Sequence, residues 1–490
     1  MGWAGLGSWI ERRARRAPRS TALRAGNARI SYKEFARLVG SIAARLLQER
    51  VAPGDRVAYN GDNRPLALAS LFAARSIGAT WVPILATRRE SEVVSILRDS
   101  SPRVLIRADP ETYPATDVLE LSAEELTDAP APPEAPSANV EPDDLAILAY
   151  TSGSTGEPKG VMLTESNLLW NVVQMAAACG LSSADVTIAS APFTRMGGLG
   201  VTVLPTLFVG GTVSIPDALD GTSVLRSIER DRVSVMFGNP DLLDRTLHAP
   251  EWATTDLGTI RTAIVGGGLV PEPLLRAYFD RGVTLRHGYG LTEAAPVVSL
   301  LDDDEAAARP TSVGKPLPFV DVRAVRPDGS ECDPGEPGEW LIRGPNVCIG
   351  YWNRPPAVDD EGWFHTGDVG SVDADGYLTF VDRASSAIRV GSLTVYPATM
   401  ELRLYGLPCI ADAAVGEVNG RLVAAVVTEP GCEPHPAVVL AALRDSLPAA
   451  AVPTEVKTVE AIPRNAAGKI RRDELRALLI ADGPHRAADR

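Results

Sequence analysis

Apolar positions in the first 150 residues fall into helical repeats and short runs that follow one another in turn. Residues 31–48 show helical spacing, with Ser31 and Glu34 in the pattern of a capping box, and residues 65–77 predict a buried helix. Short apolar runs predict buried strands at 55–59, 80–84, 104–106 and 145–150. Strands that alternate with helices are typical of a largely parallel, doubly wound sheet.

The alternation continues to about residue 300 and then gives way to strands. A helix is predicted to begin within 189–199, and strands are predicted at 210–215, 233–237 and 262–268. The last strand ends in Gly266, Gly267 and Gly268, a turn at the carboxyl end of a strand, where ligands bind in open α/β sheets. Further short strands are predicted at 320–325, 339–343, 363–368 and 377–381.

These patterns divide the chain after residue 381. Because one hydrophobic core rarely extends beyond roughly 250–300 residues, a chain of 490 residues implies at least two domains. We expect an α/β fold in which residues 1–381 form a large N-terminal domain of doubly wound, mainly parallel sheets with a β-rich subdomain. Asp382 and Arg383 mark the boundary, and residues 384–490 predict a small α+β C-terminal domain.

Composition narrows the class of protein. Apolar residues make up 45% of the chain and charged residues 22%, as in ordinary globular enzymes. A net charge of −14 argues against a nucleic-acid partner. No apolar stretch approaches the ~18 residues of a membrane span and no signal peptide is evident, so we expect a cytoplasmic protein without membrane contact. Five scattered cysteines without CxxC spacing predict neither a zinc site nor a disulfide framework.

Residues 150–160 predict a loop that cradles a polyphosphate. The loop follows the predicted strand 145–150 and precedes a helix that begins soon after residue 165. Its glycines permit backbone N–H groups to converge on phosphate oxygens, and its hydroxyls and lysine add donors and charge. The residues are Thr151, Ser152, Gly153, Ser154, Thr155, Gly156 and Lys159. The spacing excludes the loop of P-loop NTPases, and the apolar strand before it argues against a flexible linker.

The cradle resembles the signature loop of the adenylate-forming superfamily, which contains acyl- and aryl-CoA synthetases, luciferases and the adenylation domains of peptide synthetases. Three further patches match that superfamily in the same order along the chain. They are the run from His287 to Glu293, Thr366-Gly-Asp368 with Arg383, and Gly468-Lys469-Ile near the end.

The resemblance implies a role for each matching residue. Tyr289 would stack on adenine, Thr292 would donate to the α-phosphate and Glu293 would hold Mg²⁺. Asp368 and Arg383 would contact the ribose, and Lys469 would stabilise charge as a carboxylate attacks the α-phosphate. With Lys159, the catalytic set is Lys469, Thr292 and Glu293. The remaining nucleotide contacts would come from Gly267, Gly268, His287, Gly288 and Gly290.

The resemblance also implies the reaction. ATP and a carboxylic acid would give an acyl-adenylate and pyrophosphate, and the mobile C-terminal domain would rotate about residues 382–383 for transfer of the acyl group to coenzyme A or to a phosphopantetheine carrier protein. A monomer or homodimer is expected. Alternatives are an amine or nitrite as the acceptor, a catalytically silent homologue, and a kinase or ATPase that releases ADP.

Two departures from the superfamily pattern affect the acid and its acceptor. Arg195 stands where relatives commonly carry histidine beside the acyl pocket, and it would bind a second anionic group unless it turns to solvent or pairs with an acid. With Met196, Gly197, Asn239 and Gly266 as the other pocket residues, we expect an aromatic or dicarboxylic acid. The second departure, at Ser385, Ser392 and Leu393, replaces a charged hinge residue, a glycine and a glutamate, which weakens the case for coenzyme A.

Overall fold

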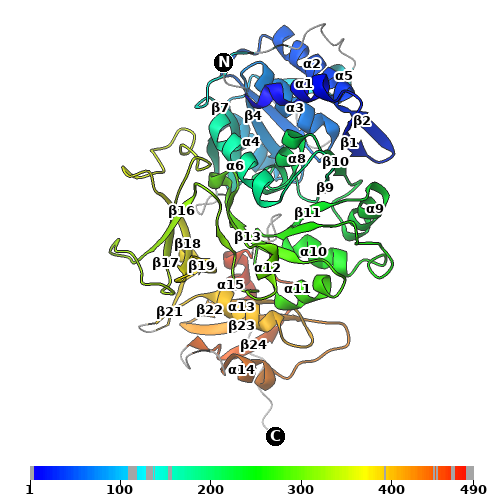
Figure 1. Cartoon of the computed structure of the whole chain (residues 1–490). Coiled ribbons are helices and arrows are strands. Elements are labelled where there is room, and N and C mark those ends of the chain that lie inside the picture. Colours follow the sequence, from blue (N-terminus) through cyan, green and yellow to red (C-terminus); the bar gives the residue numbers. More distant parts are fainter. Residues whose placement is uncertain are drawn as a thin grey trace.

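A computed structural model provides the structure of the chain (Figure 1). It describes residues 5–108, 118–127, 136, 138–152, 157–390, 393–444, 447, 451–464 and 470–481. The predicted site residues Gly153, Ser154, Thr155, Gly156 and Lys469, together with Ser392, lie outside the described residues.

The first sheet has six strands in the order β6-β5-β3-β4-β7-β8. The strands are β3 (Arg56–Gly61), β4 (Thr80–Leu85), β5 (Val104–Arg107), β6 (Leu119–Ser122), β7 (Leu145–Ser152) and β8 (Pro158–Thr164). All pairs are parallel except β7 with β8, the hairpin that carries the predicted cradle. The helices of this region are α2 (Tyr32–Gln48), α3 (Pro65–Ser76), α4 (Glu90–Ser100), α5 (Ala123–Thr127) and α6 (Glu165–Ala178), preceded by η1 (Leu6–Ser8) and α1 (Trp9–Arg16).

Helix α2 begins where the capping pattern predicts. The Ser31 side chain accepts a hydrogen bond from the Glu34 N–H at 3.2 Å, and the Glu34 carboxylate accepts one from the Ser31 N–H at 2.8 Å. These two bonds satisfy amide groups that a helix start otherwise leaves unpaired. The predicted capping box is therefore confirmed.

The second sheet has nine strands in the order β15-β14-β13-β12-β11-β9-β10-β1-β2. Its strands are β1 (Thr21–Ala25), β2 (Ala28–Ser31), β9 (Val186–Ile188), β10 (Thr212–Ile215), β11 (Val235–Gly238), β12 (Thr262–Val265), β13 (Leu285–Gly290), β14 (Val297–Leu300) and β15 (Lys315–Pro316). The strands from β1 to β13 in this order pair in parallel, and antiparallel strands close both ends. The predicted class, mixed α/β with mainly parallel sheets, is confirmed.

Helices connect the parallel strands of the second sheet and cover it. They are α7 (Met196–Gly200), α8 (Val203–Val209), α9 (Gly221–Asp231), α10 (Pro240–Leu247) and α11 (Glu272–Phe279), followed by η2 (Thr292–Ala294) and α12 (Asp303–Ala306). Buried residues of α9, α10 and α11, among them Leu225, Leu243 and Leu274, pack with Met236 and Val265 of the sheet in one hydrophobic cluster.

A four-stranded antiparallel sheet, β16-β17-β18-β19, follows the parallel sheets in the chain. Its strands are β16 (Asp321–Val325), β17 (Gly338–Arg343), β18 (Phe364–Val372) and β19 (Leu378–Arg383). Trp340 is fully buried between this sheet and the rest of the large core, together with Ile342 and Leu378. The β-rich region is thus packed onto the N-terminal sheets.

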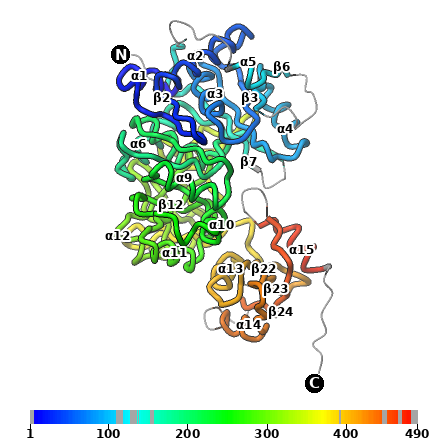
Figure 2. Tube along the Cα trace, turned by 90° about the vertical axis from the view of Figure 1, so that its right-hand side faces the viewer, coloured from blue at the N-terminus to red at the C-terminus, as the bar shows by residue number. Residues whose placement is uncertain are grey.

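The elements after Arg383 form separate small sheets with their own cores. They are η3 (Ala384–Ser386), β20 (Ile388–Val390), β21 (Leu393–Val395), α13 (Pro397–Tyr405), β22 (Ile410–Val418), β23 (Arg421–Thr428), α14 (Pro436–Arg444), β24 (Glu455–Thr458) and α15 (Arg472–Ala481). Figure 2 shows this module, in orange and red, standing apart at one end of the molecule.

The expectation of no disulfide is wrong for one pair of cysteines. Cys409 and Cys432 are disulfide-bonded, with Cα atoms 5.5 Å apart. Cys409 precedes β22 and Cys432 follows β23, and these strands pair antiparallel, so the hairpin brings the two residues together. Sequence spacing carries no sign of this because the contact depends on the strand pairing.

Within the part of the chain that the structure describes, no helix is long and apolar enough to cross a membrane.

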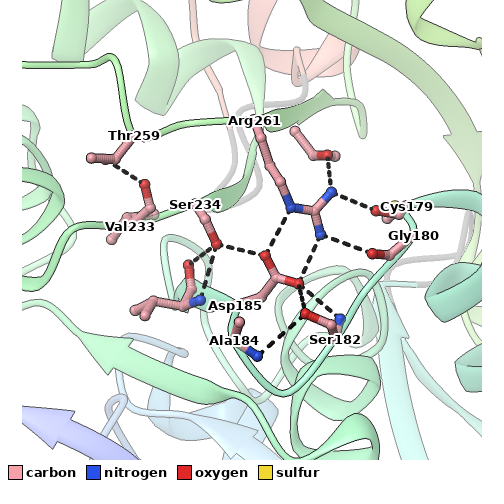
Figure 3. Close-up of polar contacts among 11 residues, drawn as sticks. Cys179, Gly180, Ser182, Ala184, Asp185, Val233, Ser234, Thr259 and Arg261 are labelled. Carbon is pink, nitrogen blue, oxygen red and sulfur yellow. Dashed lines mark hydrogen bonds and ion pairs between the residues drawn. The ribbon is translucent and has the colours of Figure 1, made fainter.

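A polar network secures the amino ends of three parallel strands in the second sheet (Figure 3). Asp185, Ser234 and Arg261 immediately precede β9, β11 and β12. The Arg261 guanidinium donates to both carboxylate oxygens of Asp185 at 2.8 Å, and the Ser234 hydroxyl donates to the same carboxylate at 2.9 Å. Burial opposes ionisation of Asp185, but the hydrogen bonds from Arg261, Ser182 and Ser234 outweigh it and lower its pKa to about 2.

We predict that Asp185→Asn destabilises the protein by about 1–3 kcal/mol at pH 7, since Arg261 and Ser234 lose an ionised partner. The pKa of Asp185 lies below the ~3.9 of an unfolded aspartate, so the stabilisation is complete above about pH 4 and is lost as the pH falls towards 2. Urea unfolding from pH 7 to 3 measures this, and the difference between wild type and variant should narrow below pH 4.

The control is Asp241→Asn, which removes an exposed aspartate paired with Arg245 on one face of α10. It should change stability by no more than about 0.5 kcal/mol. A difference between wild type and Asp185→Asn that is the same at every pH would contradict the assignment.

Candidate functional site

The carboxyl ends of the parallel strands carry most of the predicted site residues. Thr151 and Ser152 end β7, Lys159 lies in β8, and Thr151 is paired with Lys159 in the hairpin. His287, Gly288, Tyr289 and Gly290 end β13, and Thr292 and Glu293 begin η2. Gly266, Gly267 and Gly268 follow β12, Arg195 precedes Met196 and Gly197 in α7, Asn239 precedes α10, and Asp368 and Arg383 lie in β18 and β19.

Asp368 is the centre of the first cluster. Asp368 is 2% exposed to solvent. The Tyr289 hydroxyl donates to Asp368 Oδ2 at 2.6 Å, and Arg383 Nε lies 2.7 Å from Asp368 Oδ1. Asp368 and Arg383 are direct partners in the β18–β19 register, whereas Tyr289 comes from the other sheet. The three predicted nucleotide residues thus meet at the junction of the β-rich and parallel sheets.

Tyr289 is held by aromatic neighbours as well as by its hydroxyl. Its ring meets Trp340 edge-on with centroids 4.8 Å apart and stacks on Phe380 at 6.2 Å. Burial, with the charge of Asp368, raises the pKa of Tyr289 well above its usual range. Tyr289 is therefore a permanent donor to Asp368, while its stacking on adenine stays a prediction.

Tyr351 joins two more predicted residues in a second cluster. Its hydroxyl donates to Glu293 Oε1 at 2.9 Å, and Lys159 Nζ lies 5.8 Å from the centroid of its ring. Burial and the charge of Glu293 raise the pKa of Tyr351, while the charge of Arg383 opposes that rise and connects this cluster to the first. Sequence reasoning missed Tyr351, and the available signal was only an aromatic pair, Tyr351-Trp352, after Gly350, between the strands predicted at 339–343 and 363–368.

His287 is a neutral group within the site. Burial lowers its pKa to about 4, and Nδ1 is buried without a hydrogen-bond partner among the described residues. Gly266 lies close by, directly after β12, and a Cβ there would stand 2.7 Å from the Gly288 carbonyl oxygen, so only glycine fits at that position. The backbones that follow β12 and end β13 thus approach too closely for a side chain at residue 266.

Arg195 is the residue before α7, two positions from Gly197. Its Nε is buried without a partner, and among the described residues its guanidinium forms no ion pair. Burial and then the charge of Arg88 lower its pKa. The edge of the Phe237 ring lies 3.6 Å from a Cβ built on Gly197 and 3.9 Å from one built on Gly266. Phe237 therefore contacts both sides of the predicted acyl region and was missed by the sequence prediction of the pocket.

Asn239 has a structural role that the sequence prediction did not include. Its side-chain oxygen accepts a hydrogen bond from the Leu242 N–H at 2.9 Å and caps the start of α10. Asparagine at this position satisfies a free helix amide. The polar residue is thus accounted for without a ligand, and a polar pocket at Asn239 has no support from this contact.

The residues on either side of the undescribed segment 465–469 are firmly attached. Arg464 and Ile470 form an antiparallel bridge. Arg464 pairs with Asp412 at 2.7 Å, and the Arg472 guanidinium bonds the buried Glu401 at 2.5 Å. The chain is therefore anchored in the C-terminal module on both sides of residues 465–469.

The N-terminal and the C-terminal part of the chain each match a known family. Residues 10–352 match the family described as AMP-binding enzyme, and residues 399–469 match the AMP-binding enzyme C-terminal domain. A feruloyl-CoA synthase from an Amycolatopsis species is 42% identical and covers 96% of this chain, with 98% of its own length covered. An indoleacetate–CoA ligase from Aromatoleum aromaticum is 34% identical, with 97% of this chain and 98% of the relative covered.

A solved structure is similar over nearly the whole chain. The o-succinylbenzoate coenzyme A synthetase from Bacillus subtilis in complex with ATP and a magnesium ion has a TM-score of 0.87 and 28% identity, covering 96% of this chain and 99% of that one. The same enzyme in complex with its acyl-adenylate intermediate has a TM-score of 0.86, covering 96% and 97%.

We predict that His287 makes the protein less stable as the pH falls below about 6.5. The unfolded imidazole takes up a proton near pH 6.5, whereas the folded one does so only near pH 4. Urea unfolding at pH 7.5 and 5.5 should show wild type losing about 1 kcal/mol more than His287→Gln over this interval. His248→Gln, which removes an exposed imidazole on α10, is the control and should follow wild type. Identical pH dependence of wild type and His287→Gln would refute the buried neutral state.

Proposed function

This chain belongs to the AMP-binding enzyme family, and from that premise we propose that it converts an aromatic carboxylic acid into its coenzyme A thioester. It is an ATP-dependent acid–thiol ligase that forms AMP, with an acyl-adenylate as the intermediate. In the first step a carboxylate oxygen attacks the α-phosphorus of ATP and pyrophosphate leaves. In the second step the thiol sulfur attacks the acyl carbon, and the bond to AMP breaks as the thioester forms.

The observation that carries the residue assignments is the meeting of residues from three separate motifs in two clusters. Tyr289, Asp368 and Arg383 make the first cluster, and Lys159 and Glu293 share Tyr351 in the second. These residues come from β8, β13, η2, β18 and β19. Titratable and charged residues that match the superfamily's motifs and meet at the carboxyl ends of the strands are candidates for a ligand site.

Asp368 is the proposed acceptor for the ribose hydroxyls. A carboxylate offers about four lone-pair positions. The Tyr289 hydroxyl donates to Oδ2, while Oδ1 is ion-paired with Arg383 but accepts no hydrogen bond among the described residues, which leaves acceptor capacity for a ligand. Arg383 is 46% exposed and would reach the nucleotide from the end of β19. Asp368 and Arg383 together therefore suit a ligand that carries a neutral diol and a phosphate near it.

Glu293 is the proposed ligand of Mg²⁺. It forms no ion pair among the described residues, and Tyr351 engages only Oε1. No group of three or more candidate ligands is present in that part of the chain, and Mg²⁺ typically binds one or two carboxylates together with substrate phosphates. When bound there, Mg²⁺ neutralises charge on the phosphates. Lys159 and the backbone of the β7–β8 hairpin would contact the same phosphates.

Lys469 is the proposed catalytic lysine, and residues 382–383 are the proposed hinge between domains 1–381 and 384–490. Asp382 supports the hinge because its side chain accepts hydrogen bonds from the Ala398 N–H at 2.9 Å and the Arg383 N–H at 2.7 Å. The carboxylate thus ties the last strand of the N-terminal region to α13. Rotation of the small module about this point would alternate its faces towards the acyl group.

Coenzyme A is the acceptor that the relatives favour. Leu393, which weakened the case from sequence, lies in β21 and is 38% exposed. Both curated relatives described above are named for coenzyme A chemistry. Their names support the thioester product over an amide or a nitrite product.

The aromatic substrate class rests on Phe237 and Arg195. Phe237 lies between Gly197 and Gly266, where a planar substrate ring would pack against it. Arg195 forms no ion pair among the described residues and keeps a buried Nε without a partner there, which suits a substituent that accepts hydrogen bonds or carries charge. The relatives are named for feruloyl and indoleacetate groups, both aromatic.

We predict that Lys469→Ala abolishes acid-dependent exchange of pyrophosphate into ATP while ATP binding stays within about twofold of wild type. The reason is that the lysine stabilises charge in the transition state more than in the bound complex. Radioactive exchange measures the first quantity and calorimetry the second. Lys33→Ala, an exposed lysine in the first turn of α2, is the control. Exchange at the wild-type rate in Lys469→Ala would remove the assigned role, and absence of exchange with every acid would remove the proposed function.

We predict that Arg195→Leu weakens use of aromatic acids that carry a second acceptor or anionic group. The loss should be about 1.5–3 kcal/mol in kcat/KM, the value of a hydrogen bond to a charged group. Unsubstituted aromatic acids should be affected little. Steady-state kinetics over paired acids measures this, with Arg89→Leu, an exposed neighbour of Arg88, as the control. Equal losses of kcat/KM for both kinds of acid would show that Arg195 does not contact the substituent.

A further inference from the structure

The segment Cys348–Trp352 connects the two motif-bearing elements of the second cluster. On one side it pairs with β8: the Met162 N–H donates to the Gly350 carbonyl at 2.9 Å, and the Trp352 N–H donates to the Gly160 carbonyl at 2.7 Å. On the other side the Cys348 N–H donates to the Glu293 carbonyl at 2.7 Å. The backbone of residues 348–352 therefore holds β8 in place relative to η2.

Gly350 permits the backbone of this segment to bend. Its φ of +136° is a backbone conformation that favours glycine. The bend lets both Gly350 and Trp352 face β8 while Tyr351 turns towards Glu293. The bend at Gly350 thus directs the Tyr351 side chain away from β8 and into the second cluster.

We propose that Tyr351 is a positioning residue that holds Glu293 in place for Mg²⁺ and Lys159 in place for phosphate. The inference rests on the proposed function, because it concerns the groups assigned there to metal and phosphate. Two parts of one side chain make the two contacts: the hydroxyl donates to Glu293 Oε1 at 2.9 Å, and the ring lies 5.8 Å from Lys159 Nζ.

The two contacts have different chemical consequences. A hydrogen bond to one carboxylate oxygen fixes the rotation of Glu293 and leaves its other oxygen for a metal ion. A cation over an aromatic ring is attracted to the ring face within about 6 Å, so the ring holds the ammonium without neutralising it. Lys159 therefore keeps its charge for a phosphate. An acidic partner in place of Tyr351 would compete with that phosphate for the ammonium.

Other contacts also hold the hairpin in place. Tyr150 donates to Asp99 Oδ2 at 2.6 Å, and the Trp352 indole donates to the Asp99 carbonyl at 3.1 Å. These bonds secure the hairpin when the Tyr351 hydroxyl is removed. Tyr351→Phe keeps the ring and the backbone pairing, so it isolates the contribution of one hydroxyl.

The test is ATP affinity measured by calorimetry with Mg²⁺ and again with EDTA. Tyr351→Phe should bind ATP about tenfold more weakly with Mg²⁺, as expected for loss of a hydrogen bond to a charged group, and equally well with EDTA. Tyr351→Leu, which also removes the ring under Lys159, should lose affinity under both conditions. Tyr278→Phe is the control, since its buried hydroxyl bonds the Leu243 carbonyl in another part of the core.

A double variant separates positioning from general damage. Glu293→Gln should lose Mg²⁺-dependent affinity, and Tyr351→Phe added to it should cause no further loss, because the two residues act as one unit. Additive losses, or wild-type affinity of Tyr351→Phe with Mg²⁺, would overturn the role of Tyr351 alone. Wild-type affinity of Glu293→Gln would overturn both that role and the assignment of Glu293 in the proposed function. Circular dichroism of each variant verifies that it is folded.

Discussion

The buried carboxylate of Asp368 sets the constraint on which the site depends. An ionised group removed from water is stable only when donors and an opposite charge surround it. Tyr289 supplies the donor from the parallel sheet, and Arg383 supplies the charge from β19. Satisfying Asp368 therefore fixes the β-rich sheet against the parallel sheet. It also fixes the last residue before the C-terminal module, so the proposed nucleotide site and the start of the module share one carboxylate.

The two edges of the second sheet show how stability and function are separated. At the amino ends of the strands, Asp185 is saturated by Arg261 and Ser234. At the carboxyl ends, His287 and Arg195 each keep a buried nitrogen without a partner among the described residues. Saturated polar groups stabilise a fold, whereas unsatisfied ones are retained where a ligand completes them. His287 and Arg195 thus give the carboxyl edge, where the proposed site lies, hydrogen-bonding capacity for a ligand.

Much of the fold followed from local patterns, and some of it did not. The capping box at Ser31 and most strands depend on residues close together in the chain, so periodicity identified them. The placement of β1 beside β10 joins segments almost 200 residues apart and had no local signal. The cap that Asn239 provides for α10 was not predicted for a related reason, because the sequence reading had not located that helix start.

The sequence by itself determined the kinds of elements, the order of the motifs and through them the reaction class, because these depend on side-chain chemistry and short-range spacing. Only the tertiary structure decided which of those groups meet. Tyr351 reaches Glu293 across 58 residues, and Cys409 pairs with Cys432 across 23. Such contacts are set by how strands pair and how the chain reverses, and these depend on the packing of the whole core. No pattern within one segment encodes them.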